Sequence, residues 1–251
     1  MHNSLLNKVT FTWLPWAMLL LLPITFFGFL PSYFGKLHTA LPLAHHIHAG
    51  IMLLWLFMAI AQPFLIKYNK ISFHKTIGKA SYALMPFIIA SGYLILRFSY
   101  HRALSGEEVG PPGYFAEDYP LHIKAAEFVV IGFVYWLWLI IYYVFGVYYR
   151  KNTLAHATYM TAAAFTILGP AGDRFVGHVC DALDLPYNWL AENFIFILVF
   201  IYFASLLRIH HKRKLNSKPV ITTLIIHITG ILLFYLLPYL AWWNRICSQI
   251  F

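Results

Sequence analysis

The sequence predicts an all-α, polytopic membrane protein, a bundle of seven transmembrane helices. Of its 251 residues, 61% are hydrophobic and only 11% are charged, and the mean hydropathy is +0.67. A soluble domain of this length needs a much larger share of charged residues. Seven segments have the roughly 17–25 apolar residues that cross about 30 Å of hydrocarbon as a helix. Because backbone polar groups must be satisfied inside lipid, we expect these helices to form a single membrane domain over residues 1–251.

The seven spans are separated by polar turns and by clusters of charged residues. We place them near Phe11–Phe34, Ala44–Ile66, Thr76–Leu96, Ile123–Tyr149, Leu154–Gly169, Trp189–Ile209 and Val220–Trp243. The first span lacks a small-residue cleavage site after a short apolar core, so we expect it to be retained in the mature protein. Its prolines, Pro15, Pro23 and Pro31, predict kinks in the helix.

The net charge of +9 is distributed as a membrane topology requires. The basic residues that fall in alternate loops are Lys67, Lys70, Lys75, Lys79, Arg150, Lys151, Arg208, Lys212, Arg213, Lys214 and Lys218. By the positive-inside rule these loops are cytoplasmic, which places the N-terminus in the cytoplasm and the C-terminus outside. We therefore expect a multi-pass protein of the bacterial inner membrane, with the lipid bilayer and not nucleic acid as its partner.

The second span carries polar side chains near both ends of one helical face. A rotation of about 100° per residue places His48, Met52, Trp55, Ala59 and Gln62 on one stripe. His48 and Gln62 are about 21 Å apart along the axis. Ionisable groups within membranes tend to face the bundle interior and mark sites, so His48 is a candidate. The alternative is a histidine that bonds water at the headgroup level.

The third and fourth spans flank the longest predicted loop, residues 98–121, which contains Gly-Pro-Pro-Gly. Loops of this length are usually functional or mobile. His74 precedes the third span and is expected in a corner rather than in a helix. The fourth span opens with His122 and is dense in aromatic residues, which either face lipid or form the wall of a pocket for a flat cofactor.

The fifth span holds His156 and Met160 on one face. It is expected to end at Gly169-Pro170, which delivers Asp173 and Arg174 to the outer surface. This pair either caps the helix end and contacts headgroups or recognises an anionic group such as a carboxylate or a haem propionate.

The seventh span contains one buried histidine, and two cysteines lie in the outer segments on either side of the last two spans. His227 lies roughly 12 Å inside the seventh span, where it is either functional or a neutral imidazole bonded to a helix carbonyl. Cys180 and Cys247 both fall outside in this topology, either as a disulfide or as two separate thiols.

Sorted by predicted side, the histidines form one group near each membrane surface. His48 and His122 lie near the outer surface, and His74 and His156 lie near the inner one. Each iron of two b-type haems stacked across a membrane takes two neutral imidazoles from facing helices. The pattern therefore favours a haem b electron-transfer protein, in which Arg174 pairs with a propionate and a quinol or another small reductant supplies electrons.

This placement of ligands resembles the ascorbate-type transmembrane di-haem cytochromes b. A second block reads His48-x-x-x-Met52, Trp55, Gln62-Pro63, His74-Lys75-x-x-Gly78, Arg150, His156-x-x-x-Met160, Gly169-Pro170 and Arg174. The block resembles a broad set of uncharacterised bacterial multi-helix membrane proteins, with Lys75 in place of the usual Arg. The resemblance covers roughly residues 45–175 and implies no activity. It does favour His48, His74, His156, Gln62 and Arg174 as cofactor-binding residues.

Two other functions are compatible with the sequence, so whether the protein is an enzyme stays open. A zinc-dependent intramembrane hydrolase could take three ligands from His45, His48, His122, Asp173 and His178 and keep a position for water. Seven helices with a cytoplasmic N-terminus resemble the adiponectin-receptor class, but the paired His-x-x-x-His of that class is missing. A small proton-coupled transporter could relay protons through His227 and His156, although no internal repeat is evident.

Overall fold

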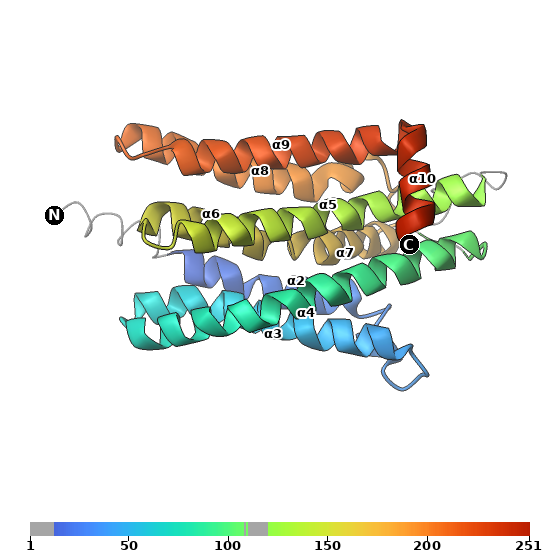
Figure 1. Cartoon of the computed structure of the whole chain (residues 1–251), viewed down its shortest axis with the longest axis horizontal. Helices are drawn as coiled ribbons and strands as arrows, with labels where there is room; N and C mark the ends of the chain where they lie inside the picture. Colours follow the sequence, from blue (N-terminus) through green and yellow to red (C-terminus); the bar gives the residue numbers. More distant parts are fainter. Residues whose placement is uncertain (1–12, 108, 110–119) are drawn as a thin grey trace. The chain divides into compact units, whose positions relative to one another are not determined.

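The computed structural model describes residues 13–107, 109 and 120–251. Within these ranges the secondary structure is helical with no strand, which confirms the all-α class (Figure 1). Five helices are long and apolar enough to cross a membrane. They are α3 (Leu43–Lys67), α4 (Ile71–Leu104), α5 (Leu121–Tyr148), α8 (Trp189–Lys212) and α9 (Lys218–Leu236), the last continued by the 3-10 turn η2 (Leu237–Tyr239).

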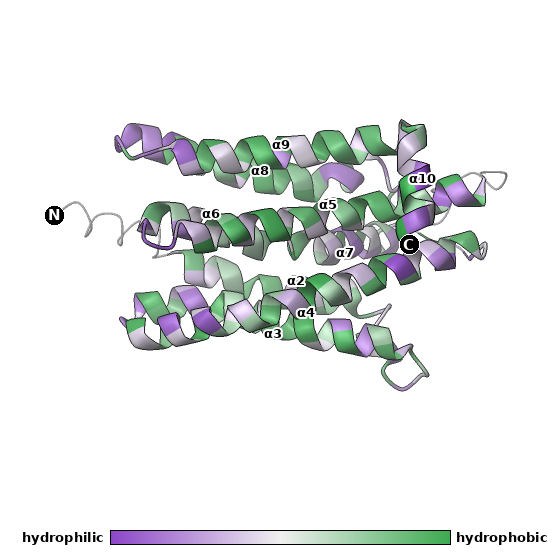
Figure 2. Ribbon diagram, viewed as in Figure 1, coloured by the Kyte–Doolittle hydropathy of each residue, from purple (hydrophilic) through white to green (hydrophobic). Residues whose placement is uncertain are grey.

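The chain divides into two compact units, Met1–Tyr93 and Leu94–Phe251, with α4 contributing residues to both. The single membrane domain expected over the whole chain therefore stays a prediction. In both units the long helices are apolar along their middle parts and hydrophilic toward their ends (Figure 2). Many of their large apolar side chains are exposed, as lipid contact requires, including Leu54, Phe57, Phe87, Ile225 and Leu232.

In the first unit, helical residues run from Trp13 to Phe29 with a turn at Leu20, after which α2 (Leu21–Phe29) begins. Pro23 explains the turn because its ring clashes with the carbonyl four residues earlier. The segment is shorter than the predicted Phe11–Phe34 span, whose first two residues lie outside the described ranges. A 3-10 turn, η1 (Phe34–Lys36), follows.

Of the next two helices, α3 agrees with its predicted span and α4 corrects both the start and the end of the third span. α3 agrees with the predicted Ala44–Ile66 to within one residue at each end, whereas α4 begins five residues before Thr76 and extends beyond Leu96 to Leu104. His74 therefore lies in the first turn of α4 and not in a corner. Residues 98–104, which were expected in a loop, are also helical, and the Gly-Pro-Pro-Gly motif lies outside the described ranges.

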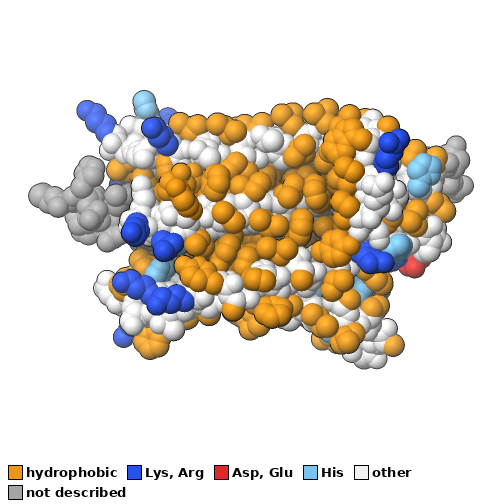
Figure 3. Space-filling view, in the orientation of Figure 1, with side chains coloured by type: hydrophobic (Ala, Val, Ile, Leu, Met, Phe, Trp, Pro, Cys, Tyr) orange, Lys and Arg blue, Asp and Glu red, His pale blue; other side chains and the backbone are white. Residues whose placement is uncertain are grey.

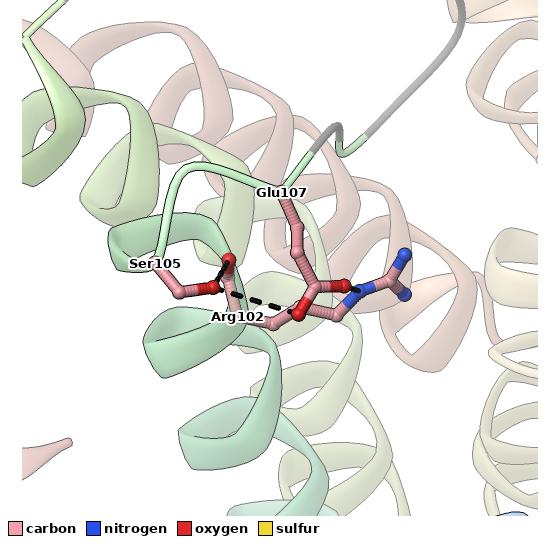
Figure 4. A network of polar contacts seen from close by, with 3 residues as sticks. All are labelled: Arg102, Ser105 and Glu107. Carbon is pink, nitrogen blue, oxygen red and sulfur yellow. Dashed lines mark hydrogen bonds and ion pairs between the residues drawn. The ribbon is translucent and has the colours of Figure 1, made fainter.

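A small polar network closes the end of α4 (Figure 4). Arg102 Nε donates to Glu107 Oε2 at 2.7 Å, and Ser105 Oγ lies 2.8 Å from the Arg102 carbonyl and 3.5 Å from Glu107 Oε1. The Arg102 and Glu107 side chains are 47% and 58% exposed, and pairs this exposed typically contribute less than about 1 kcal/mol. The network therefore fixes the chain direction beyond α4 more than it stabilises the fold.

In the second unit, α5 packs against α6 (Thr153–Phe165), α9 and α10 (Ala241–Ile250), while α7 (Leu168–Ala182) packs mainly against α8 (Figure 1). Two asparagines start helices as N-caps. The Asn152 side chain accepts from the Ala155 amide, and the Asn188 side chain accepts from the Leu190 and Ala191 amides. These caps confirm the predicted starts near residues 154 and 189.

The predicted fifth span is interrupted between α6 and α7. Pro170 lacks an amide hydrogen, and its ring disfavours a helical carbonyl at Thr166, four residues earlier. The Thr166 hydroxyl donates to the Ala163 carbonyl at 2.7 Å and satisfies an acceptor at the end of α6. The helix therefore breaks at residues 166–167, before Gly169-Pro170 rather than at it, and resumes through Ala182.

The helix in the region of the predicted seventh span, Val220–Trp243, ends earlier than expected. Helix α9 ends two residues before Pro238, and α10 follows as a separate helix. The Trp243 Nε1–H group donates to the Ala126 carbonyl at 2.9 Å, which attaches α10 to the beginning of α5. Cys247 on the same helix is fully buried, and both it and Cys180 are free thiols. Of the two possibilities, a disulfide or two separate thiols, the structure contains two separate thiols.

The centre of the second unit is a contact between the Trp138 indole on α5 and the backbone of α9. Trp138 Nε1–H donates to the Ile226 carbonyl at 2.9 Å, and a Cβ atom at Gly230 would lie 2.3 Å from the indole ring. A glycine is required there because backbone and ring approach each other directly. Helices α5 and α9 are therefore held at a separation that only a glycine allows.

We predict that Gly230→Ala destabilises the protein, by about 1–3 kcal/mol, because the added methyl group overpacks against Trp138. The measurement is the midpoint of thermal unfolding of the detergent-solubilised protein, followed by near-ultraviolet circular dichroism. Gly177→Ala in α7 is the matched control, since no heavy atom lies within 4 Å of its new Cβ. Equal midpoints for the two variants would contradict the close approach.

Candidate functional site

The candidate site residues of the first unit begin with His48 on α3. Its Nδ1 atom lies 3.2 Å from Ser91 Oγ on α4, and Ser91 Oγ donates to the Ile88 carbonyl at 3.3 Å. The serine hydroxyl has one hydrogen and two groups within reach, so this contact is compatible with either tautomer of His48. The predicted stripe that contains Trp55 and Gln62 is the less exposed face of α3.

Gln62 and His74 meet at the other end of α3. Gln62 Nε2 donates to the His74 main-chain carbonyl at 3.3 Å, across the turn between α3 and α4. Gly78 leaves room for this amide, since a Cβ atom there would lie 4.0 Å from Gln62 Nε2. Gln62 Oε1 is buried and accepts no hydrogen bond from any described residue. A buried amide oxygen without a donor is a place where a ligand can bind.

In the second unit, His156 and Met160 share one face of α6, as their spacing predicts, and both meet α5 at Gly146. His156 Nδ1 lies 2.7 Å from the Gly146 carbonyl. A Cβ atom at Gly146 would clash with the Met160 side chain. Since a carbonyl can only accept, Nδ1 of a neutral His156 carries the hydrogen and Nε2 carries the lone pair. His48 and His156 therefore both form a hydrogen bond through Nδ1.

The buried His227 has the opposite arrangement. Its Nε2–H group donates to the Phe196 carbonyl of α8 at 3.0 Å, and its ring stacks on Trp138 with 4.7 Å between centroids. The imidazole is 2% exposed. Of the two interpretations of His227, the structure favours the neutral imidazole bonded to a helix carbonyl, because the nitrogen that reaches across the helix interface is already used.

The remaining histidines of the predicted haem and zinc sets are distributed over both units. His122 is exposed at the start of α5, and His178 is half-buried on α7. His45, on α3, is one turn from His48. Each predicted haem pair takes one histidine from each unit, His48 with His122 and His74 with His156, so both pairings stay predictions.

The zinc set also draws on both units, with His45 and His48 in the first and His122, Asp173 and His178 in the second. Throughout the described ranges, no group of three or more histidine, cysteine, aspartate or glutamate side chains is placed to hold a metal ion. A zinc site needs three or four such ligands around one point. Like the haem pairs, the zinc set stays a prediction.

Asp173 and Arg174 lie within α7 and not beyond the end of a helix as expected. Arg174 is exposed and its Nη1–H group donates to the Pro170 carbonyl at 2.7 Å. Asp173 lies outside the five long apolar helices. Burial raises the pKa of its carboxyl group to about 8, an effect that Arg174 partly offsets and Glu192 increases.

The partners of the candidate histidines were missed by sequence reasoning. Ser91 and Gly146 supply the hydrogen-bond partners of His48 and His156, but each lies on another helix. A signal exists only for Gly146, because a glycine within an aromatic helix suggests a close approach. For Ser91 no local pattern distinguishes it from the other small residues of α4.

These features define the class of protein. Five long apolar helices with exposed apolar surfaces, and buried polar groups that bond to helix carbonyls, are the properties of a multi-pass integral membrane protein. Comparisons with protein families, with curated proteins and with solved structures give no match for this chain.

We predict that the stability of the protein falls as the pH rises from about 4 toward 8. An unfolded aspartate ionises near pH 3.9, whereas folded Asp173 keeps its proton to about pH 8. Between these values the folded state binds more protons, so the free energy of unfolding decreases with pH. Asp173→Asn should raise the unfolding midpoint at pH 8 and leave it unchanged at pH 4.

The control for this effect is Asp181→Asn, a change at an exposed carboxylate on the same helix. Its midpoint should follow that of the unmodified protein at every pH. If Asp173→Asn gives the same shift at pH 4 and at pH 8, the proton on Asp173 is not responsible.

Proposed function

We propose that this protein is a b-type haem-binding electron-transfer protein of the bacterial inner membrane, with seven membrane crossings and a cytoplasmic N-terminus. The five long helices supply five crossings. The segment Trp13–Phe29 has about the minimum length for a sixth, and α6 with the first residues of α7, through Gly169, forms a broken seventh, so that Asp173 lies beyond its end. Basic residues in alternate loops support the orientation.

The observation that carries the proposal is that His48 and His156 both form a hydrogen bond through Nδ1. A histidine that coordinates a metal usually donates its other ring N–H group to a carbonyl or hydroxyl, which fixes the ring and raises its basicity. His48 Nδ1 lies 3.2 Å from Ser91 Oγ, and His156 donates Nδ1–H to the Gly146 carbonyl. We assign the Nδ1–H tautomer to both rings, in which Nε2 is the nitrogen that binds haem iron.

Two further residues, Gln62 and Arg174, support the proposal, which also assigns the second histidine of each pair. The buried Gln62 Oε1 lacks a donor beside His74. In the proposed assignment His122 completes the site of His48, and His74 completes that of His156. Arg174 is exposed on α7 and supplies a cation for a propionate. Haem b, when bound, supplies a one-electron iron couple for electrons from a quinol or another small reductant.

The first test of this function is an absorption spectrum of the full chain, purified in detergent from cells supplied with a haem precursor. We expect a Soret band that shifts on reduction with dithionite. The combined change His48→Ala and His156→Ala should abolish the band, because one ligand of each proposed pair is lost.

The matched control replaces two exposed histidines, His38→Ala and His101→Ala, and should retain the full band. Both variants must elute from gel filtration at the volume of the unmodified protein. Absence of a Soret band in the unmodified chain rejects the haem function. A band that survives the double change at His48 and His156 rejects the assigned ligands.

A second prediction concerns the hydrogen bond that orients His48. Ser91→Ala removes the acceptor for Nδ1–H, so the ring loses its fixed orientation, and haem affinity should fall about 10- to 100-fold. Ser91→Thr keeps the hydroxyl and should retain most of the affinity. Titration of the haem-free protein with haemin measures the change. Equal affinities for the alanine and threonine variants would show that the bond does not support a ligand.

A further inference from the structure

A groove runs along the end of α8 where that helix connects to α9. Its apolar wall consists of Ala204, Leu207 and Ile221, and its rim consists of Arg208, His211, Lys212 and Ser217. From Ala204 to Lys212 the groove extends about 12 Å along the α8 axis. The groove is therefore apolar where α8 passes into its hydrophobic middle part and cationic at the helix end.

The cationic rim has no acidic counterpart in this part of the chain. No aspartate or glutamate occurs between residue 193 and the C-terminal residue 251. Arg208, His211 and Lys212 are exposed on the last turns of α8, and Lys218 begins α9. Figure 3 shows Lys, Arg and His side chains gathered at this end beside a hydrophobic surface. The positive charge of the rim therefore has no acidic side chain within residues 193–251 to neutralise it.

The turn that joins α8 to α9 is fixed by internal hydrogen bonds. His210 is 1% exposed, its Nδ1–H group donates to the Asn216 carbonyl at 3.2 Å, and its own carbonyl accepts from the Leu215 amide at 2.9 Å. Lys214 takes the left-handed conformation that the tight turn needs, with φ of 55°. The α8 side and the α9 side of the groove are thus joined by a turn that internal hydrogen bonds hold in place.

We propose that this groove binds one anionic phospholipid of the leaflet that it faces, with phosphatidylglycerol as the model ligand. The phosphodiester group lies between Arg208 and Lys212, where Arg offers paired N–H donors and Lys a compact positive charge. An acyl chain covers Ala204, Leu207 and Ile221. Basic pockets between transmembrane helices are suited to such headgroups, and each cation near the surface strengthens the attraction.

The test is native mass spectrometry of the full chain in detergent, titrated with phosphatidylglycerol or with phosphatidylcholine of the same acyl chains. We expect one phosphatidylglycerol to bind in preference to phosphatidylcholine. Arg208→Gln with Lys212→Gln should weaken phosphatidylglycerol binding about tenfold or more, because two cations are lost. Arg150→Gln with Lys151→Gln removes the same charge from the exposed α5–α6 turn and should leave the affinity unchanged.

A further variant separates a lipid from free phosphate. Ala204→Trp fills the apolar wall and keeps every charge, so it should also weaken phosphatidylglycerol binding, and added inorganic phosphate should not displace the lipid. If phosphate displaces the lipid and Ala204→Trp binds normally, the site recognises phosphate alone and the proposal is wrong. Equal losses from the Arg208/Lys212 and Arg150/Lys151 variants would show non-specific attraction to surface charge and would also overturn it.

Discussion

The structure of the second unit depends on side-chain N–H and O–H groups that donate to main-chain carbonyls of neighbouring helices. Trp138 and Tyr142 on α5 donate to the Ile226 and Thr223 carbonyls of α9, and His227 on α9 donates to the Phe196 carbonyl of α8. In an apolar interior such donors have no water as an alternative partner, so leaving one unpaired costs several kcal/mol. Three helices are thereby fixed in register, and the Gly146 carbonyl used by His156 belongs to one of them.

The positions of the prolines explain why the sequence predicts that a segment is helical more accurately than it predicts where the helix ends. Pro23, Pro170 and Pro238 each remove an amide donor from an apolar segment, and each segment contains a break or an end within four residues of its proline. Hydropathy alone merges the pieces on either side of a break, because both are equally apolar. Helices α5 and α8 contain no proline, and α3 continues through Pro63. The predicted bounds of these three helices were accurate to within three residues.

The candidate site was predictable only as far as one helix determines it. The phase of α3 relates His48 to Gln62, and the spacing on α6 relates His156 to Met160, because both relations are set by the helical repeat. Their partners Ser91 and Gly146 lie on other helices, and which histidine each one meets depends on helix packing that no local pattern encodes. The early start of α4, which places His74 in a helix, was missed because Lys70–Lys75 is polar and lies outside any apolar window.

The nitrogen through which each histidine bonds separates His227 from the proposed ligands His48 and His156 more sharply than depth in the membrane does. His227 is the most deeply buried of the three histidines compared, yet it bonds through Nε2, the atom farthest from its own backbone, and so joins two helices as a strut. His48 and His156 bond through Nδ1, to Ser91 Oγ and to the Gly146 carbonyl. In the proposed haem function this bond orients the ring, and Nε2 is the iron ligand. Depth alone would rank His227 first among the functional candidates, whereas hydrogen-bond geometry ranks it last.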